Sequence, residues 1–372
     1  MTPPPPRLRT RPPIKHDAIV RHLRSLVIDG GLRPGQRVPT RSQVEQRFGV
    51  STMTVQRAFE RLVDEGFLTV TGSTGTVVAE QAPHLHRYVL AFPGHVGDDR
   101  WVRFWALLAE QGRGWTDGTP AKVELAYDID PERGPHDVVR LGSEADDHRM
   151  AGIVFASDPW TMLGTPLLDA PGVARVAFSG LHPNTTVPGI SLGADGRLLL
   201  GRAIERLAAR GRRRLAMITV PGLSSPALLG LWRDLLAARG LDYDPGLVQV
   251  AEQKDARWAM HLVLALFRGP PEQRPDGLLI ADDNLVDHAC AGLERLGLRV
   301  PADLDVVAHA NFPLAAPAPL TVDRLGFDVP QVFDLAMDLL ARQRRGETVP
   351  AVTIVHPRFI DEREQRSEGV IP

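Results

Sequence analysis

The chain has 372 residues, of which 43% are hydrophobic and 24% charged, which is typical of a soluble globular protein rather than a fibrous or disordered one. This length exceeds one ordinary hydrophobic core, so we expect two or more domains. Cys290 is the single cysteine, which excludes an intramolecular disulfide, and no apolar run reaches the roughly 18 residues of a membrane helix. We expect a cytoplasmic protein with no secretory signal and no membrane partner.

The charges are unevenly distributed along the chain. Residues 1–80 hold 12 Lys+Arg and 7 Asp+Glu, whereas the remainder holds 31 and 38. A basic head on a larger acidic body favours contact of the head with a polyanion, although scattered surface charge explains the same numbers about equally well.

The first 80 residues predict a flexible arm and a small α+β domain. Residues 1–13 are rich in proline and arginine, so we expect them to form neither a helix nor a central strand. In residues 14–80, apolar spacing predicts a helix over 15–29, a short helix capped by Thr40 or Ser42, and a third capped by Ser51. The stretch "FLTVTGSTGTVVA" predicts a hairpin. Three helices followed by a hairpin form a winged helix-turn-helix.

The third helix has an apolar stripe for the core and an opposite polar face that suits a DNA groove. Short hydroxyl side chains in its first turn let the backbone approach phosphates, and Met53 can contact a thymine methyl group. Gln56 can pair with adenine, and Arg57 can reach guanine or a phosphate. Alternatively the hydroxyls only cap the helix and the Gln and Arg are solvated; the two readings are compatible for Ser51. The predicted DNA-facing residues of this helix are Ser51, Thr52, Met53, Thr54, Gln56 and Arg57.

Residues 30–78, "GGLRPGQRVPTRSQVEQRFGVSTMTVQRAFERLVDEGFLTVTGSTGTVV", resemble the GntR family of bacterial regulators. The resemblance covers the L-x-P-G turn and the F-G-V-S motif between the second and third helices. It also covers the E-G motif that ends the third helix and the G-x-G-T motif of the wing hairpin. It implies that the wing tip, Ser73 and Thr74, enters the minor groove of double-stranded DNA. Thr52 stands where many members have arginine, and the arginine of the second helix comes one place early, at Arg41. The resemblance therefore implies a DNA contact from Arg41.

From residue 87 onward short apolar strands alternate with helices. Segments such as "YVLAF", "GIVFA", "LAMITV" and "GLLIA" predict strands, and the clearest helices begin near Trp101, Gly196, Pro226, Arg257, Asn284 and Pro330. This alternation favours parallel sheets covered by helices on both faces, in two α/β lobes.

The order of these motifs resembles the sensor domain of LacI-type repressors, which has the two-lobed α/β fold of type I periplasmic binding proteins. The matching stretches are residues 189–219, 274–311 with "GLRVPADLDVV", and 318–340. We therefore expect a linker over 81–86, an effector-binding and dimerisation domain over 87–360 and a tail over 361–372. The resemblance implies a homodimer that binds a pseudo-palindromic operator, most often as a repressor.

Ligands of such folds bind beyond the carboxyl ends of strands, in the cleft between the lobes. Each single candidate there is about as well explained as an ordinary loop position, with Asp282 and Asn311 the strongest. The candidate effector-binding residues are His95, Asp158, Trp160, Ser224, Ser225, Asp282, His309 and Asn311.

Two departures weaken the expectation of a sugar effector. LacI-type sugar sensors usually have an arginine at the position of Ala227 and an aspartate at the position of Ala310. Without these charged anchors, sugar hydroxyls have fewer charge-assisted hydrogen bonds. We infer either that the effector is not a typical pentose or hexose or that the pocket has drifted, and we still expect a sugar or related polyol first.

The sequence offers no catalytic or cofactor motif. We find no phosphate-binding loop, nucleophile elbow or defensible metal-ligand spacing, so we expect no enzyme activity, no cofactor and no metal. The function that we predict is a sequence-specific transcription regulator controlled by a small-molecule effector. The alternative is a small-molecule-binding protein, or a GntR-headed enzyme, in which the head serves assembly.

Overall fold

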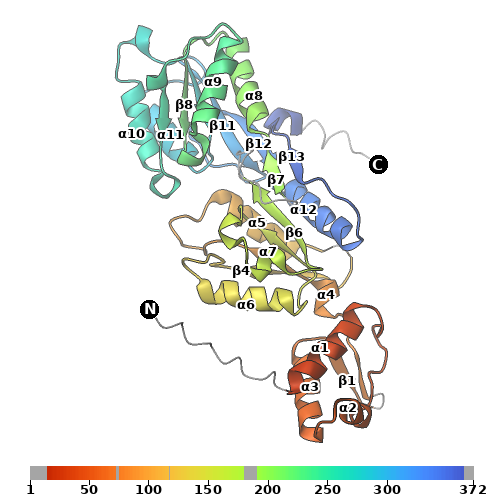
Figure 1. The fold of residues 1–372 in the computed structure, drawn as a ribbon. Coiled ribbons are helices and arrows are strands. Elements are labelled where there is room, and N and C mark those ends of the chain that lie inside the picture. Colours follow the sequence, from red (N-terminus) through yellow and green to blue (C-terminus); the bar gives the residue numbers. More distant parts are fainter. Residues whose placement is uncertain (1–14, 73–74, 117, 180–190, 364–372) are drawn as a thin grey trace, which may run out of the picture.

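A computed structural model describes residues 15–72, 75–116, 118–179 and 191–363. Three bodies follow one another along the long axis of the molecule: a small head, a first α/β lobe and a second α/β lobe (Figure 1). This arrangement confirms the predicted winged head followed by a two-lobed α/β body.

The head packs three helices against a two-stranded hairpin. Thr40 caps α2 in a reciprocal capping box with Gln43, and Gly49 ends that helix at a φ of 60°, a backbone conformation that suits glycine. Buried side chains from all three helices and both strands form one core. The elements of the head are α1 (Lys15–Ile28), α2 (Arg41–Phe48), α3 (Thr52–Asp64), β1 (Leu68–Thr71) and β2 (Gly75–Val78).

A short helix joins the head to the first lobe. The expected linker over 81–86 contains α4 (Pro83–His86), so this part of the chain is folded and partly buried. Proline at the first helical position needs no amide hydrogen and starts the helix.

The first lobe is a six-stranded sheet in the order β13-β7-β6-β5-β3-β4, parallel throughout. Its elements are β3 (Arg87–Ala91), α5 (Arg103–Gly114), β4 (Lys122–Ala126), α6 (Pro135–Asp146), β5 (Gly152–Phe155), η1 (Trp160–Met162), α7 (Pro166–Asp169), β6 (Ala174–Ser179), β7 (Ser191–Ala194), α12 (Val329–Arg344) and β13 (Val352–Val355).

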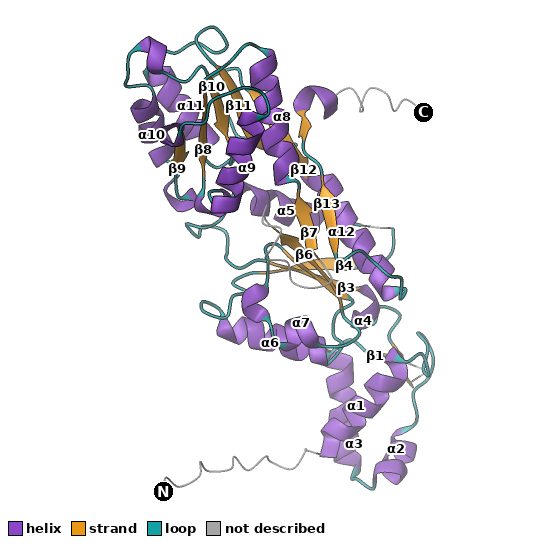
Figure 2. Ribbon diagram, turned by 45° about the horizontal axis from the view of Figure 1, so that its top comes forward, coloured by secondary structure: helices purple, strands orange, loops and turns teal. Residues whose placement is uncertain are grey.

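The second lobe is a sheet in the order β14-β12-β11-β10-β8-β9, in which only the pairing of β14 is antiparallel (Figure 2). Its elements are α8 (Gly196–Ala209), β8 (Leu215–Thr219), η2 (Pro221–Leu223), α9 (Pro226–Ala237), η3 (Pro245–Leu247), β9 (Val248–Val250), η4 (Gln253–Asp255), α10 (Trp258–Leu266), η5 (Pro271–Gln273), β10 (Gly277–Ile280), α11 (Val286–Arg295), β11 (Asp305–Phe312), β12 (Asp323–Asp328) and β14 (Arg358–Phe359).

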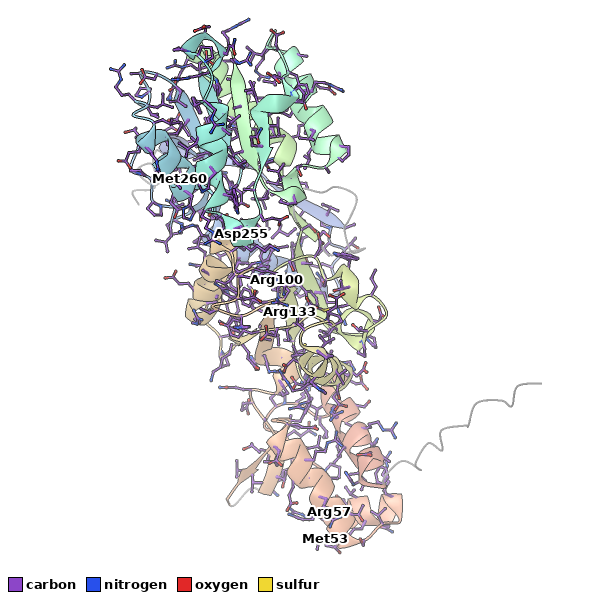
Figure 3. All side chains as sticks on the ribbon, turned by 90° about the vertical axis from the view of Figure 1, so that its left-hand side faces the viewer. Met53, Arg57, Arg100, Arg133, Asp255 and Met260 are labelled. Atoms are coloured by element: carbon purple, nitrogen blue, oxygen red, sulfur yellow. The ribbon has the colours of Figure 1, made fainter. Side chains whose placement is uncertain are left out.

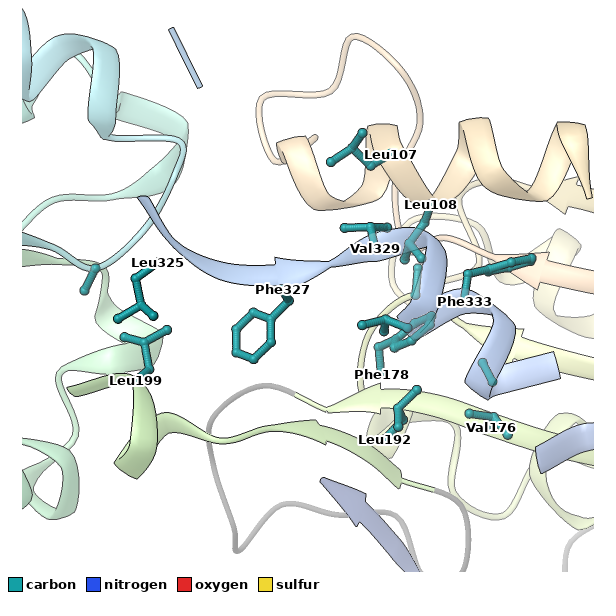
Figure 4. Close-up of a cluster of buried hydrophobic side chains, with 14 of the residues drawn as sticks. Leu107, Leu108, Val176, Phe178, Leu192, Leu199, Leu325, Phe327, Val329 and Phe333 are labelled. Carbon is teal, nitrogen blue, oxygen red and sulfur yellow. The ribbon is translucent and has the colours of Figure 1, made fainter. Parts of the chain in front are cut away.

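The chain crosses between the lobes three times, after β7, after β12 and after β13. One continuous apolar core runs along these crossings, and Phe327 lies between the side chains of the two lobes (Figure 4). The second lobe has a separate core on the other face of its sheet. Among the described helices, none combines the length and the hydropathy needed to span a bilayer.

Candidate functional site

Many of the predicted functional residues lie in two regions: the exposed face of α3 and the cleft between the lobes. On α3, Val55, Ala58 and Leu62 are fully buried, whereas the Met53 side chain is 62% exposed. Met53 and Arg57 lie at the end of the head that is farthest from the lobes (Figure 3). A large exposed apolar side chain at this place is available to a partner.

Gln56 lies between two charged side chains on this face. Arg41 Nε donates to Gln56 Oε1 at 2.8 Å, and Gln56 Nε2 donates to Glu60 Oε1 at 2.8 Å. The Arg41 guanidinium also lies over the Phe59 ring, 5.3 Å from its centroid. The structure therefore places Arg41 and Gln56 together, which the sequence spacing of 15 residues did not show.

Ser51 occupies the N-cap position of α3, but its hydroxyl does not cap a backbone amide. It lies 3.0 Å from the hydroxyl of Thr54 instead. The expected side-chain cap is therefore wrong, because the neighbouring hydroxyl competes for the same oxygen. Ser51 and Thr52 remain exposed, and Ser73 and Thr74 lie outside the described residues.

The cleft between the lobes encloses about 670 Å³ at the carboxyl ends of the parallel strands. A volume of this size suits a small organic ligand. Most of its wall is apolar and comes from both lobes and from the crossing segments. The apolar lining includes Phe104, Trp105, Phe178, Leu192, Leu199, Val220, Leu223, Phe327, Val332 and Val355.

Four of the predicted effector-binding residues border this cleft: Asp158, Asp282, His309 and Asn311. The Ser179 hydroxyl donates to Asp158 at 2.9 Å, and His309 Nδ1 is buried without a hydrogen-bond partner. The His309 ring packs edge-on against Phe327. Whether these residues contact an effector stays a prediction.

The other four predicted residues lie outside the lining of the cleft. His95 is bonded to Asp128 at 2.9 Å, and the Trp160 side chain is 62% exposed. Ser224 donates to the Pro221 carbonyl, and Ser225 accepts from Leu228 N as the N-cap of α9. The loops after the strands turn these side chains toward solvent or local backbone, and strand ends in the sequence do not reveal such turns.

Several residues around Asp282 border the cleft but were not predicted from the sequence. Asp283, Asn284 and Gln253 border the cleft beside it, as do the aromatic side chains Phe104 and Trp105. Asp283 and Asn284 directly follow Asp282 in the sequence, so their position after a buried strand could have identified them. The aromatic pair lies on α5, far from any strand end, and only the tertiary structure brings it to the cleft.

One group of described side chains has donors suited to a cation. Ligand atoms of His95, Asp98 and Asp128 lie within 4.8 Å of one another. The Asp98 carboxylate is already paired with Arg133 and lies 3.8 Å from Arg100, so these arginines balance its charge.

A partly buried ion-pair network joins the head to the first lobe. Arg24 on α1 donates to Glu65 at 2.6 Å and to Asp147 at the end of α6. Arg61 donates to Asp17 and Glu65, each at 2.8 Å, and lies 3.5 Å from Asp147. Burial alone raises the pKa of Glu65, but the hydrogen bonds from Arg24 and Arg61 outweigh it and hold this pKa below its ordinary value.

The linker helix adds a second contact to this junction. The His84 ring stacks on Phe67 of the head, with 5.7 Å between ring centroids, and burial lowers the pKa of His84 to about 4. Arg344, at the far end of α12, donates to the Tyr88 hydroxyl at 2.6 Å and to the His84 carbonyl at 3.5 Å. Because Val332 of α12 borders the cleft, this helix runs from the cleft to the linker.

Comparison with known families agrees with this architecture. Residues 15–78 match the family described as bacterial regulatory proteins, gntR family, and residues 204–364 match the periplasmic binding protein-like domain. The chain joins a gntR-type regulatory domain to a periplasmic binding protein-like domain.

Curated relatives match parts of this chain. The mannosyl-D-glycerate transport/metabolism system repressor MngR of Escherichia coli (strain K12) is 36% identical over 63 residues, which are 17% of this chain and 26% of the relative. The HTH-type transcriptional repressor PurR of Edwardsiella ictaluri (strain 93-146) is 28% identical over 181 residues, 45% of this chain and 49% of the relative. The chain therefore spans half or less of these relatives' own length.

Solved structures share the fold of the body. A LacI family transcriptional regulator from Arthrobacter sp. FB24 in complex with lactose has a TM-score of 0.58 and 18% identity, over 74% of this chain and 97% of that one. The transcriptional regulator CelR–cellobiose complex has a TM-score of 0.57 and 20% identity, over 87% and 98%. At these identities the likeness concerns the fold alone.

Proposed function

We propose that this protein is a transcription repressor whose affinity for operator DNA is controlled by a small-molecule effector bound in the interlobe cleft. The observation that carries the proposal is the pairing, in one chain, of an exposed recognition face on α3 with a 670 Å³ cleft in a two-lobed body. The relatives that match the head and the body are themselves described as repressors, which supports this assignment.

The effector acts by changing how the lobes close. The α5 backbone amide of Arg103 donates to Asn284 Oδ1 at 3.0 Å, and its guanidinium lies 3.5 Å from Asp287. These contacts join the first lobe to the second beside the cleft, so a ligand that favours one lobe spacing strengthens or weakens them.

The head responds because it is fixed to the first lobe. The Arg24 network and the α4 contacts carry a shift of the first lobe to α3, and α12 ends at the same junction. In a homodimer on a pseudo-palindromic operator, such a shift changes the spacing of the two recognition helices. By linkage, an effector that releases the operator binds less tightly to the DNA complex.

A gel-shift measurement with DNA upstream of the protein's own gene tests the proposal. Because Gln56 faces outward on α3, Gln56→Ala is expected to cost about 1–3 kcal/mol on the operator and little on random DNA. Gln331→Ala, on the exposed surface of α12, is the matched control and leaves binding unchanged. Equal losses on operator and random DNA would contradict base reading by Gln56.

A further inference from the structure

Two adjacent carboxylates at the end of β10 border the cleft and are almost fully buried. Asp282 is 8% exposed and Asp283 is 2% exposed. Asp282 accepts hydrogen bonds from Gln253 Nε2 at 2.7 Å, Asn284 N at 2.9 Å and Asn284 Nδ2 at 2.8 Å. Asp283 accepts from Asn311 Nδ2 at 2.8 Å and Asn284 Nδ2 at 3.3 Å. All of these donors are neutral.

The other buried carboxylates of the described chain are paired with arginines. Asp305, in the same sheet, receives Arg210 at 2.7 Å and Arg212 at 2.6 Å. Glu144 lies 2.9 Å from Arg87 and 3.1 Å from Arg140.

Asp282 and Asp283 have no such partner. Within the described residues, no Lys, Arg or His nitrogen lies within the 4.0 Å ion-pair distance of either carboxylate. Burial raises the pKa of Asp283, and the charge of Asp282 adds to this effect, while His309, Asn311 and Arg103 oppose it. A buried carboxylate without an ion pair is costly, and a cation beside it offsets that cost. The charges of His309 and Arg103 offset it only in part, and Arg324 also interacts with Asp283 from a longer distance. These two carboxylates differ from the others in that they face a cavity that a ligand can enter.

The first-lobe wall of the cleft offers aromatic faces, besides a polar corner formed by Ser157, Asp158 and Ser179. Phe104 and Phe178 pack edge to face, with 5.4 Å between centroids. Trp105 uses its indole N–H on the Ala156 carbonyl at 3.0 Å, so it presents only its ring to the cleft. An apolar ring packs well on such a surface, and aromatic faces also attract cations.

Arg100 and Lys254 also border the cleft, and among the described residues neither forms an ion pair with Asp282 or Asp283. Arg100 lies near Asp98 and Asp130 and donates to the Pro93 carbonyl, and Lys254 is solvent-exposed. Neither Ala227 nor Ala310, the positions of the missing sugar anchors, borders the cleft.

We propose that the effector is an organic cation with an apolar, ring-sized body, whose protonated nitrogen contacts Asp282 and Asp283 while its ring packs on Phe104, Trp105 and Phe178. That the bound cation acts as an effector rests on the proposed function. That it binds in the cleft does not. In place of the expected sugar, we propose a ligand whose charge complements the Asp282 and Asp283 carboxylates of the second lobe. Its ring packs on the aromatic side chains of the first lobe.

Matched probe pairs test the ligand class in a thermal-shift assay of the full chain. Tryptamine, phenethylamine and benzamidine are compared with the neutral counterparts tryptophol, 2-phenylethanol and benzamide, and with ribose and cellobiose. A ligand that binds the folded state raises the midpoint by mass action. At least one cation is expected to bind about tenfold or more tightly than its neutral counterpart, because only the cation compensates the carboxylates.

Variants then locate the contact. Asp282→Asn keeps the side-chain shape and should weaken binding of the cation about tenfold, with Asp283→Asn as a second, independent variant. Asp334→Asn, which removes an exposed charge on α12, is the matched control and should bind the cation normally. Circular dichroism and calorimetric unfolding of each variant show whether it is folded.

Several outcomes would overturn the ligand class: equal binding of cation and neutral partner, stabilisation by a sugar alone, no stabilisation by any of the three cations, or unchanged cation binding in both folded variants. A different result would contradict the proposed function without contradicting the ligand class. If a cation binds and needs Asp282, but the gel shift shows no operator binding, the ligand class stands and the role as repressor does not.

Discussion

The Arg24 network makes a quantitative prediction about the junction between head and body. Asp147 is the part of this network that belongs to the first lobe, and its side chain is 26% exposed. It accepts from Arg24, which is 5% exposed, and lies 3.5 Å from Arg61. Asp147→Asn removes the charge from the lobe while leaving the Arg24–Glu65 pair inside the head intact.

The free energy of docking that Asp147→Asn removes is expected to lie between two limits. Exposed ion pairs contribute about 0.2–1 kcal/mol, and breaking a buried pair costs about 3–5 kcal/mol. Because Asp147 is partly exposed but has two arginine partners, we expect Asp147→Asn to weaken docking by about 1–2 kcal/mol. This corresponds to roughly a 5- to 30-fold larger population of undocked heads.

Thermolysin cleavage before Leu85 of α4 measures that population. The linker is folded between head and lobe, so it is cut mainly from the undocked state, and the rate follows the open population while reclosing is fast. Asp146→Asn, which removes a neighbouring exposed charge with no ion pair among the described residues, is the matched control. If both variants are cut at the same rate, the network does not hold the head to the lobe.

Two further predictions concern charge. If the dimer makes about six phosphate contacts, operator affinity should fall on the order of 10³-fold between 50 and 200 mM salt in a gel shift, and a flat response would contradict DNA binding by the basic face. Burial lowers the pKa of His84 from 6.5 to about 4. The unfolded state therefore binds more protons between these values, so His84 makes the free energy of unfolding rise as pH increases from about 4 to 6.5. Urea unfolding of the wild type and His84→Gln across this range should show a smaller rise in the variant, and an unchanged rise would exclude His84 as its source.

The head was predictable because its signals are local. Capping at Thr40, the stop at Gly49 and the apolar stripe of α3 each depend on residues within a few positions of one another. The sequence also predicted the strands of the body where these are central and largely apolar, as in β5, β8 and β10. The strands β7, β9, β12, β13 and β14 were not predicted, because they are short or are interrupted by glycine or polar residues.

The candidate effector site was only half predictable. Asp282 and Asn311 follow or end buried strands, and parallel strands bring their carboxyl ends to one edge of a sheet. His95 and Trp160 also lie just after strands, yet their loops carry them away from the cleft. The direction in which a loop leaves a strand depends on packing that sequence position does not encode.

The sequence by itself determined the classes of the parts: a winged head, two α/β lobes, and a third helix with Gln56 and Arg57 on the face opposite its apolar stripe. These follow from periodicity, caps and motif spacing, which act over short distances along the chain. Only the tertiary structure decided which distant residues meet, including Arg24 with Asp147 and the pair Asp282–Asp283 opposite the aromatic wall. Those contacts form between segments that are far apart in the sequence, and their charge balance exists only once the chain is folded.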